Sequence, residues 1–464
     1  MRSVLCGLSL GACLLEIRPA AAEIPLAEKD GFTFFTDGRI NAFFSQGIGD
    51  AFPQPTPNTN VTPSGMPAPS HGVVGSGQSF TAGYESKQAD ANNNYSAQRV
   101  RNGFLATILG LGMRKKISET TVTGYVALWG TTQSFQRDRT TDSGNSHTKG
   151  FDVRNGYVEL EGPWGDVKAG RQLGIFGDIS TEIDYNYGHG YGLGLPCVDE
   201  YYASCGHIGT GALGPGFAAG IVYSTPSFGG LKLTAGFFDP VRLLGAWNRV
   251  PIARPEGTIT FERQLSSTTF LKLAVEGMYQ PMARVESQVD PNTGVSTLIN
   301  RTDAVWGVAG GGRIEVGPVR FGASAFRGKG LGAYVALQNS SSSFNQATFN
   351  LRSFTGYYAQ AALVFGRAQI SAGAGRVIDD QLEEDKVNAN SSELKWQTGF
   401  SLGFFYSLTD YLVLGLDYFR FQTDWWGAPN STLDANNNVV LLPGVLTPEQ
   451  QIINFINAGA TLHW

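Results

Sequence analysis

Residues 34–44 read FFTDGRINAFF, and this stretch decides the fold class. Every second position, from Phe34 through Ile40 to Phe44, carries an apolar or small side chain, whereas Asp37 and Arg39 lie on the opposite parity. A period of two indicates a β-strand with one apolar and one polar face. The same alternation recurs at 121–131, 269–280, 394–406 and 456–464. The chain is therefore predicted to be all-β.

The connections between these segments alternate in length. Short turns lie at 162–165, 224–230, 266–267, 317–318, 366–367 and 409–410, and long polar loops at 47–97, 135–150, 173–216, 241–255, 281–302, 328–350, 379–393 and 426–451. Alternating short and long connections are typical of a transmembrane antiparallel β-barrel. About sixteen strands are predicted, at 32–46, 97–113, 120–134, 151–162, 166–173, 217–225, 231–239, 256–265, 268–280, 303–316, 318–327, 351–365, 368–378, 394–408, 411–425 and 451–464.

A lipid bilayer offers no hydrogen-bond partners to a free sheet edge, so a membrane-spanning sheet has to close into a barrel. The apolar side chains of such a barrel would point toward lipid and the polar ones toward a lumen. A soluble β-sandwich or propeller would also alternate, but with its apolar face turned inward. Aromatic residues near strand ends favour the barrel, since such residues form girdles at membrane interfaces. Examples are Trp129, Tyr279, Tyr411 and Trp464.

Composition excludes other classes of protein. Charged residues make up 16% of the 464, below the roughly 25% of soluble chains. After the first 22 residues no apolar run is long enough for a membrane-spanning helix. A net charge of −5 and a pI near 5.6 argue against a nucleic-acid-binding protein, which usually carries a basic stripe.

The first 22 residues, MRSVLCGLSLGACLLEIRPAAA, have the pattern of a secretory signal peptide. Arg2 supplies positive charge, an apolar core follows, and Ala20–Ala22 gives a small-residue cleavage site. A lipoprotein signal ending at Cys13 is the alternative, although the apolar run continues past that cysteine. Residues 1–22 are thus predicted to be removed, which leaves residues 23–464 as a single barrel domain.

Two cysteines remain after that cleavage, Cys197 and Cys205. An even, closely spaced pair in an exported chain suggests one disulfide that closes a small loop. His189 and His207 flank the pair, so a metal site is an alternative, but the spacing matches no common zinc pattern.

Two blocks of sequence resemble the general diffusion porins of Gram-negative outer membranes. Residues 154–172, RNGYVELEGPWGDVKAGRQ, are similar to the strand–turn–strand block that leads into that family's long third loop. Residues 221–237, IVYSTPSFGGLKLTAGF, are similar to the hairpin after it. The resemblance implies a sixteen-stranded homotrimer in the outer membrane, in contact with lipid and lipopolysaccharide. It also implies passive diffusion of small hydrophilic solutes and ions, without a cofactor.

The resemblance also places the functional region. In the family the third loop, here 173–216, folds into the lumen, and its acidic residues face basic residues on the opposite wall. The acidic counterparts here are Asp178, Glu182 and Asp184, and the expected basic wall residues are Arg39, Arg99, Arg101 and Arg154. The family's basic residue on the strand after that loop is missing from 217–225. Opposed charges across a pore would set its ion preference.

Two other functions stay open. A substrate-selective channel, for a sugar or an organic anion, would show a ladder of lumen aromatic residues, and only scattered candidates such as Tyr125, Phe238 and Phe405 are present. A barrel enzyme would need a nucleophile with a base, yet none of the five histidines sits in a recognisable catalytic motif. The chain is therefore predicted not to be an enzyme, and no metal or nucleic-acid partner is expected.

Overall fold

A computed structural model describes residues 23–50, 94–130, 151–188, 192–196, 204–240, 250, 252–289, 296–332, 344, 348–384, 394–425, 429–433, 439–446 and 450–464. The predicted signal peptide and most of the proline-rich first loop lie outside these residues. No helix among them is long and apolar enough to cross a membrane.

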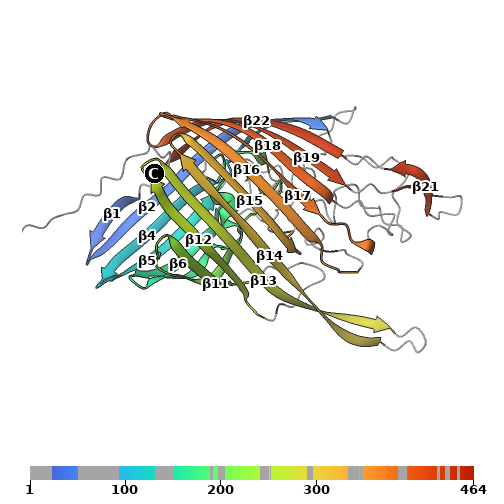
Figure 1. Cartoon of the computed structure of the whole chain (residues 1–464), viewed down its shortest axis with the longest axis horizontal. Coiled ribbons are helices and arrows are strands. Elements are labelled where there is room, and N and C mark those ends of the chain that lie inside the picture. The colour runs from blue at the N-terminus through green and yellow to red at the C-terminus, as the bar shows by residue number, and fades with distance from the viewer. Residues whose placement is uncertain are drawn as a thin grey trace, which may run out of the picture.

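The strands form a closed antiparallel barrel of sixteen positions (Figure 1). Neighbouring positions pair along the chain, and pairing of the first with the last closes the ring. Two short strands, at 94–101 and 107–117, share one position, and both pair with the first strand. The wall strands are β2 (Phe32–Asp50), β3 (Asn94–Arg101), β4 (Thr107–Ile117), β5 (Thr120–Gly130), β6 (Phe151–Gly162), β7 (Gly165–Leu173), β10 (Phe217–Ser224), β11 (Leu231–Phe238), β12 (Arg254–Ser266), β13 (Thr269–Val289), β14 (Ser296–Val316), β15 (Val319–Lys329), β16 (Ser353–Phe365), β17 (Ala368–Asp379), β18 (Leu394–Ser407), β19 (Leu412–Trp425) and β22 (Gln450–His463). The prediction of an all-β barrel with about sixteen strands is confirmed.

The two ends of the described chain share one wall position. β22 pairs with residues 39–49 of β2, and β1 (Ile24–Lys29) pairs with residues 32–36 at the start of the same strand. The β1–β2 turn uses Asp30 and Gly31 at φ of 53° and 75°, the left-handed pair that a two-residue type I′ hairpin requires. Trp464 and Gly38 exchange two backbone hydrogen bonds of 2.9 and 3.0 Å, which fix the register of the seam.

The accessibility of side chains confirms which face is apolar. On β2, Ile40 and Phe44 are each 48% exposed on the outside, whereas the inward Asn41 and Phe43 are 1% and 0% exposed. The outer surface carries many more large exposed apolar side chains, from Leu109 on β4 to Ile456 on β22. A surface of this kind is stable in lipid and would be an aggregation hazard in water.

Two strands depart from the predicted bounds. The segment predicted at 97–113 is broken into β3 and β4, because Asn41 takes over the hydrogen bonds of the gap: it accepts from the amide of Gly103 (2.8 Å) and donates to the carbonyl of Leu105 (2.6 Å). β13 and β14 continue into the loop predicted at 281–302 as a long hairpin that projects from the barrel (Figure 1). Backbone pairing sustains that hairpin in water as well as in lipid.

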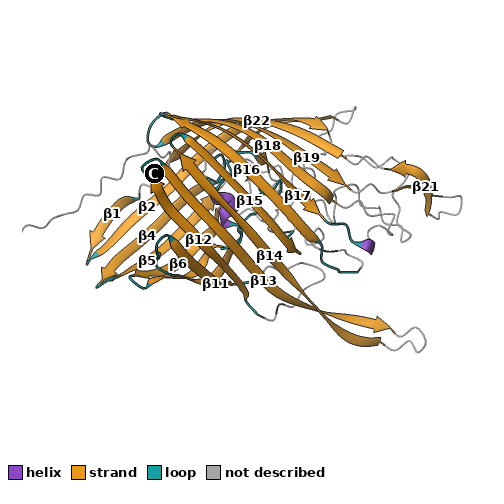
Figure 2. Cartoon of the chain, viewed as in Figure 1, coloured by secondary structure: helices purple, strands orange, loops and turns teal. Residues whose placement is uncertain are grey.

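The described parts of the predicted third loop, within 174–188, 192–196 and 204–216, lie inside the barrel (Figure 2). They contain the one-turn helix α2 (Asp178–Glu182) and the short pair β8 (Leu195–Pro196) and β9 (Ser204–Gly206). Outside the barrel wall, a further pair, β20 (Pro429–Leu433) and β21 (Val439–Leu446), lies in the loop predicted at 426–451.

Candidate channel constriction

The first part of the loop is held against the wall by two glutamates. Glu256 on β12 accepts hydrogen bonds from the amides of residues 175–176 at 2.7 and 2.9 Å, and Glu276 on β13 accepts from those of Gly177 and Ile179 at the same two distances. The first amides of a helix have no partner within the helix, so a carboxylate placed there stabilises its start. These wall residues thus fix where α2 lies.

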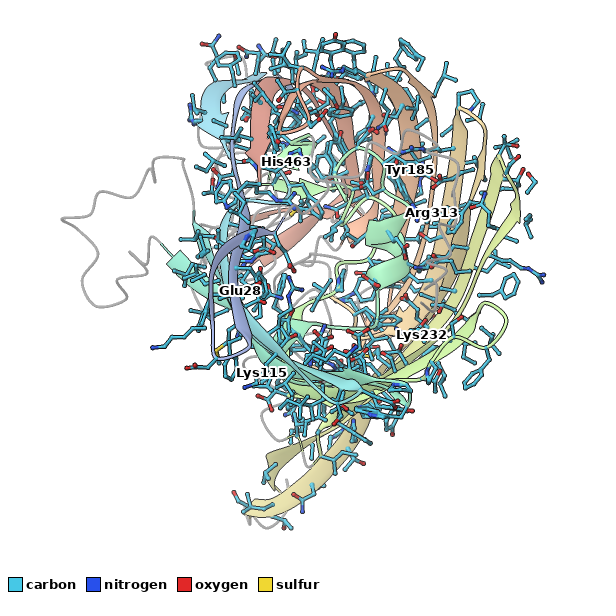
Figure 3. All side chains as sticks on the ribbon, turned by 90° about the vertical axis from the view of Figure 1, so that its left-hand side faces the viewer. Glu28, Lys115, Tyr185, Lys232, Arg313 and His463 are labelled. Atoms are coloured by element: carbon cyan, nitrogen blue, oxygen red, sulfur yellow. The ribbon has the colours of Figure 1, made fainter. Side chains whose placement is uncertain are left out.

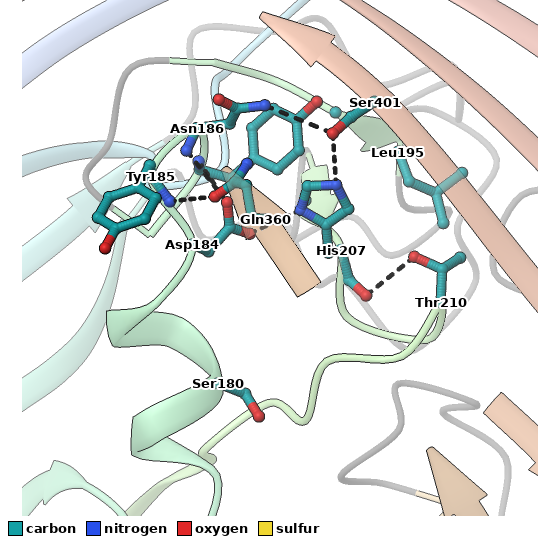
Figure 4. A network of polar contacts seen from close by, with 12 residues as sticks. Ser180, Asp184, Tyr185, Asn186, Leu195, His207, Thr210, Gln360 and Ser401 are labelled. Carbon is teal, nitrogen blue, oxygen red and sulfur yellow. Dashed lines mark hydrogen bonds and ion pairs between the residues drawn. The ribbon is translucent and has the colours of Figure 1, made fainter. Parts of the chain in front are cut away.

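The middle of the loop is held by a buried serine–histidine–aspartate network (Figure 4). Nδ1 of His207 lies 2.8 Å from Oδ2 of Asp184, and Nε2 lies 2.8 Å from Oγ of Ser401 on β18. Asp184 also accepts from the amides of Asn186 and Tyr187 at 3.1 and 3.0 Å. Two parts of the loop are thereby tied to each other and to the wall.

This network has the connectivity of a catalytic triad but not its accessibility. Ser401 and His207 are fully buried, and the imidazole ring is packed between Tyr187 and Tyr358, with ring centroids 4.6 and 4.5 Å away. A nucleophile must reach its substrate to act. We therefore assign the network to holding the loop in place.

The far part of the loop is held by Asp417 on β19. Its carboxylate is 1% exposed and accepts from the amides of Leu193 and Gly194, both at 3.1 Å, from Nδ2 of Asn457 at 2.8 Å and from the hydroxyl of Tyr187 at 3.3 Å. Three of these four donors belong to the loop, and the fourth, Asn457, belongs to β22 of the wall. The loop thus covers the inner face from β12 to β22.

The remaining inner wall is not covered in this way. On β2, β5–β7 and β11, inward charged and polar side chains keep partial exposure; they include Asp37, Arg39, Glu159, Asp166, Lys168, Lys232 and Thr234. Behind the loop, the inward polar residues Ser324, Gln360, Ser371, Gln397 and Ser401 are at most 6% exposed. Figure 3 shows α2 against one side of the barrel beside Arg313, with Lys232 on the wall below it. The interior therefore has a dry side and a wet side.

The three acidic residues predicted for the loop lie in three different environments. Asp178 is exposed toward the lumen. Glu182 pairs with Lys272 at 2.7 Å and with Arg313 at 3.6 Å, so its charge is balanced by the wall against which α2 rests and not across the lumen. Asp184 is 3% exposed within the histidine network, where it does not line open space.

The four arginines predicted for the opposite wall also differ in exposure. Arg39 and Arg99 point inward with partial exposure. Arg101 is only 7% exposed. Arg154 is 5% exposed and its guanidinium stacks on the ring of Trp129, 4.8 Å from the centroid. Burial and stacking therefore remove Arg101 and Arg154 from the group of lumen-lining charges.

Among the described acidic residues of the loop, Asp178 is the one whose side chain is exposed. Its carboxylate forms no ion pair among the described residues, although water reaches it. The enclosing protein and, secondarily, the nearby Glu182 raise its pKa to about 6, with Lys272 opposing the shift. It is therefore ionised at pH 7 and becomes neutral as the pH falls below 6.

The structure describes one of the two cysteines of the predicted disulfide and one of the two histidines of the alternative metal site. Cys205 is disulfide-bonded and buried, while Cys197, its predicted partner, lies outside the described residues. His207 is committed to Asp184 and Ser401. Across the part of the chain that the structure describes, no group of three or more histidine, cysteine or acidic side chains could hold a metal ion.

A closed barrel with an apolar outside, an inward-folded loop and a charged wet wall defines a transmembrane β-barrel channel. The model of the Gram-negative porin family matches residues 70–424 of this chain. The chain belongs to this family and is an outer-membrane protein that forms a channel for small hydrophilic solutes and ions.

Comparison with solved structures finds porins, one of them with a TM-score above 0.5. The anion-selective porin from Comamonas acidovorans gives a TM-score of 0.53 at 15% identity, covering 93% of this chain and 100% of that one. OmpT of Vibrio cholerae gives 0.49 at 11% identity, covering 95% and 99%, and Salmonella typhi OmpF in complex with daunomycin gives 0.48 at 12%, covering 95% and 100%. No curated protein matches the sequence.

Sequence reasoning missed the residues that position the loop. Glu256, Glu276 and Asp417 are acidic residues on the inward parity of wall strands, and that parity was readable from the sequence. An inward acid among small or apolar inward neighbours, such as Glu276 between Ala274 and Met278, indicates a buried contact with something inside the barrel. No local signal could have joined Ser401 to His207, because 194 residues separate them.

Proposed function

We propose that solutes cross by passive diffusion along the wet wall of β2, β5–β7 and β11, with Asp178 of α2 facing that path. The observation that carries this proposal is the contrast in exposure between the two inner walls. Charged side chains on the wet wall keep partial exposure, whereas Glu256, Glu276 and Asp417 on the other wall are buried and hydrogen-bonded to the loop. Asp178 on one side, with Arg39 and Arg99 on the other, would bias which ions pass.

Ion selectivity in a planar bilayer tests this proposal through its pH dependence. As the pH falls from 7 to 5, Asp178 gains a proton, because its pKa is about 6, and the path loses one negative charge. The reversal potential in a salt gradient should shift toward anion preference over this interval. The Asp178→Asn variant should lack the shift. An equal shift in the variant, or no channel activity, would contradict the proposal.

The proposal includes a non-enzymatic role and an exported precursor. The only serine–histidine–aspartate network in the described residues is sealed from solvent, which favours a channel without catalysis. Residues 1–22 would act as the signal peptide, and residues 23–464 would form the barrel that contacts outer-membrane lipid and lipopolysaccharide.

A homotrimer is the proposed assembly. Small residues on the outer faces of β5–β7, including Gly124, Gly156 and Ala169, would let neighbouring walls approach closely. A Cβ atom placed on Gly156 would meet only a Val153 methyl group, at 3.7 Å, so this outer face is flat. Analytical ultracentrifugation in detergent should give the mass of three chains; a single-chain mass would contradict this assembly.

A substrate-selective channel is the second candidate. It is favoured by one observation, a pocket in the wet wall that is lined by aromatic and donor side chains.

A further inference from the structure

Three arginines stand on the lipid-facing side of the barrel wall, on strands that run in the same direction (Figure 1). They are Arg327 on β15, Arg376 on β17 and Arg420 on β19. Each is paired across the sheet with an exposed residue of the outer face, and these partners are in turn Val308, Tyr357 and Phe400. Residues paired across a sheet share one of its faces, so the three arginines point away from the lumen.

The three arginines also lie at one height around the wall. Each comes eight residues after the first residue of its strand, which is Val319, Ala368 or Leu412. Eight residues of about 3.3 Å span about 26 Å along a strand, and a tilt of about 35–45° leaves about 20 Å of height. Every outward residue between that start and the arginine is apolar or a tyrosine. The apolar band of such barrels is about 25 Å tall and arginine side chains extend toward water, so the row marks the edge of the band at the long external loops.

Two of these arginines form no ion pair within the part of the chain that the structure describes. Arg376 donates to Oγ1 of Thr398 at 2.8 Å, and its guanidinium group lies 4.2 Å from the centroid of the Trp396 ring. Nη1 of Arg420 contacts the amide oxygen of Asn454 at 3.5 Å. Both positive charges therefore remain on the outer face without a carboxylate in contact.

The acidic residues farther along the same strands do not contact them. Asp380 pairs with Arg327 at 2.5 Å, which balances the third arginine of the row. Asp424 accepts a hydrogen bond from Nε2 of Gln450 at 3.1 Å. Arg376 and Arg420 are thus the two charges at this height that a ligand from the membrane would meet.

The chemistry of the row specifies the kind of ligand. A positive charge on the lipid-facing side costs free energy in hydrocarbon, and an anionic headgroup beside it removes that cost. Arginine suits phosphate in particular, because its planar guanidinium group donates two parallel hydrogen bonds to neighbouring oxygens. Tyr357 and Thr398, the cross-strand neighbours of Arg376, add hydroxyl groups to the row. The row therefore favours a lipid headgroup that carries phosphate.

We propose that Arg376 and Arg420, with Arg327 at the end of the row, bind the phosphate groups of lipopolysaccharide in the outer leaflet. The inference rests on the proposed contact of the barrel with this glycolipid and names the surface that makes it. Alternate strands are on the order of 10 Å apart, so a headgroup with two phosphates can contact both arginines at once, which a phospholipid with one phosphate cannot. The row lies outside β5–β7, the proposed subunit face, and so stays open to lipid in a homotrimer.

Native mass spectrometry of the purified full chain in detergent tests the site, with diphosphoryl lipid A, the lipid part of lipopolysaccharide, as the probe. Dephosphorylated lipid A keeps the acyl chains and should bind about tenfold more weakly or worse. The double variant Arg376→Gln, Arg420→Gln should weaken binding of diphosphoryl lipid A by about tenfold or more. Arg263→Gln is the matched control, because it removes an exposed outward arginine at the opposite, short-turn end of β12, and it should bind as the wild type does.

The lipid probes need no variant, so they keep the test decisive if the double variant folds poorly. Phosphatidylglycerol, with one phosphate, should bind the wild type about tenfold more weakly than diphosphoryl lipid A. Equal binding of dephosphorylated lipid A or of phosphatidylglycerol, or unchanged binding in the folded double variant, would overturn the site. Conductance is measured on the same preparations and should equal that of the wild type in both variants, because the row lies outside the lumen. A chain that conducts without this lipid preference overturns the site alone, whereas one that does not conduct overturns the channel function.

Discussion

Replacing Asp417 with alanine is expected to release the far part of the third loop from the barrel wall. The change leaves the amides of Leu193 and Gly194 without their buried acceptor, whereas Nδ2 of Asn457 still donates to the carbonyl of Gly194 at 3.2 Å. Each buried donor that loses its partner costs about 1–3 kcal/mol, so the contact should be weakened by about 3 kcal/mol or more. Local opening of the loop should then become over 100-fold more frequent. Limited proteolysis should cut the variant near residues 192–212 while the wild type resists, and single-channel currents should become noisier.

The control for this experiment lies on the same strand. Asp424→Ala removes a carboxylate whose hydrogen bond, from Gln450, is exposed, and it should leave both proteolysis and current noise unchanged. Asp417→Asn keeps one acceptor oxygen and should fall between the wild type and the alanine variant. Resistance of Asp417→Ala to protease, together with quiet currents, would show that the loop is held by other contacts.

Reversing the charge of Asp178 with lysine should move the channel toward anion preference. A unit charge about 7 Å from a passing ion contributes roughly 0.6 kcal/mol in water, and salt screens part of it. Exchanging a negative for a positive charge should therefore change the cation-to-anion permeability ratio by about fivefold to tenfold. The measurement is the reversal potential at pH 7 under a salt gradient.

Two further variants separate this effect from a general loss of charge. Asp178→Asn should shift the reversal potential about half as far. Asp410→Asn removes an acid from the exposed turn before β19 and should not shift it. If all three variants matched the wild type, Asp178 would not face the conducting path.

The barrel could be predicted from the sequence because its determinants are local. Alternation along 34–44 gave the correct outward residues, Ile40 and Phe44, since a strand places successive side chains on opposite faces whatever lies around it. The exceptions have physical causes. Asn41 lets the wall strand break after Arg101, and the β13–β14 hairpin needs no lipid to stay paired.

The candidate site could be predicted only in part. The resemblance located the loop and named Asp178 and Asp184 alike as its acidic residues, but of these two only Asp178 is exposed. It could not separate Asp178 from Asp184, because the two lie six positions apart in the sequence but in different environments. Asp178 is exposed, whereas Asp184 is buried in a network with His207. Arg154 likewise stands at a strand bulge, between Val153 and Asn155, where parity no longer predicts direction.

The central claim is that water follows one inner wall and that the loop seals the other. Cysteine substitution with a membrane-impermeant thiol reagent, applied during bilayer recording, tests it most directly. Lys168→Cys on the wet wall should react and reduce the current, because Lys168 is partly exposed beside Glu159. Ser371→Cys, at a site that is 2% exposed behind the loop, should not react. Equal reaction at both positions, or reaction at position 371 alone, would contradict this account of the channel.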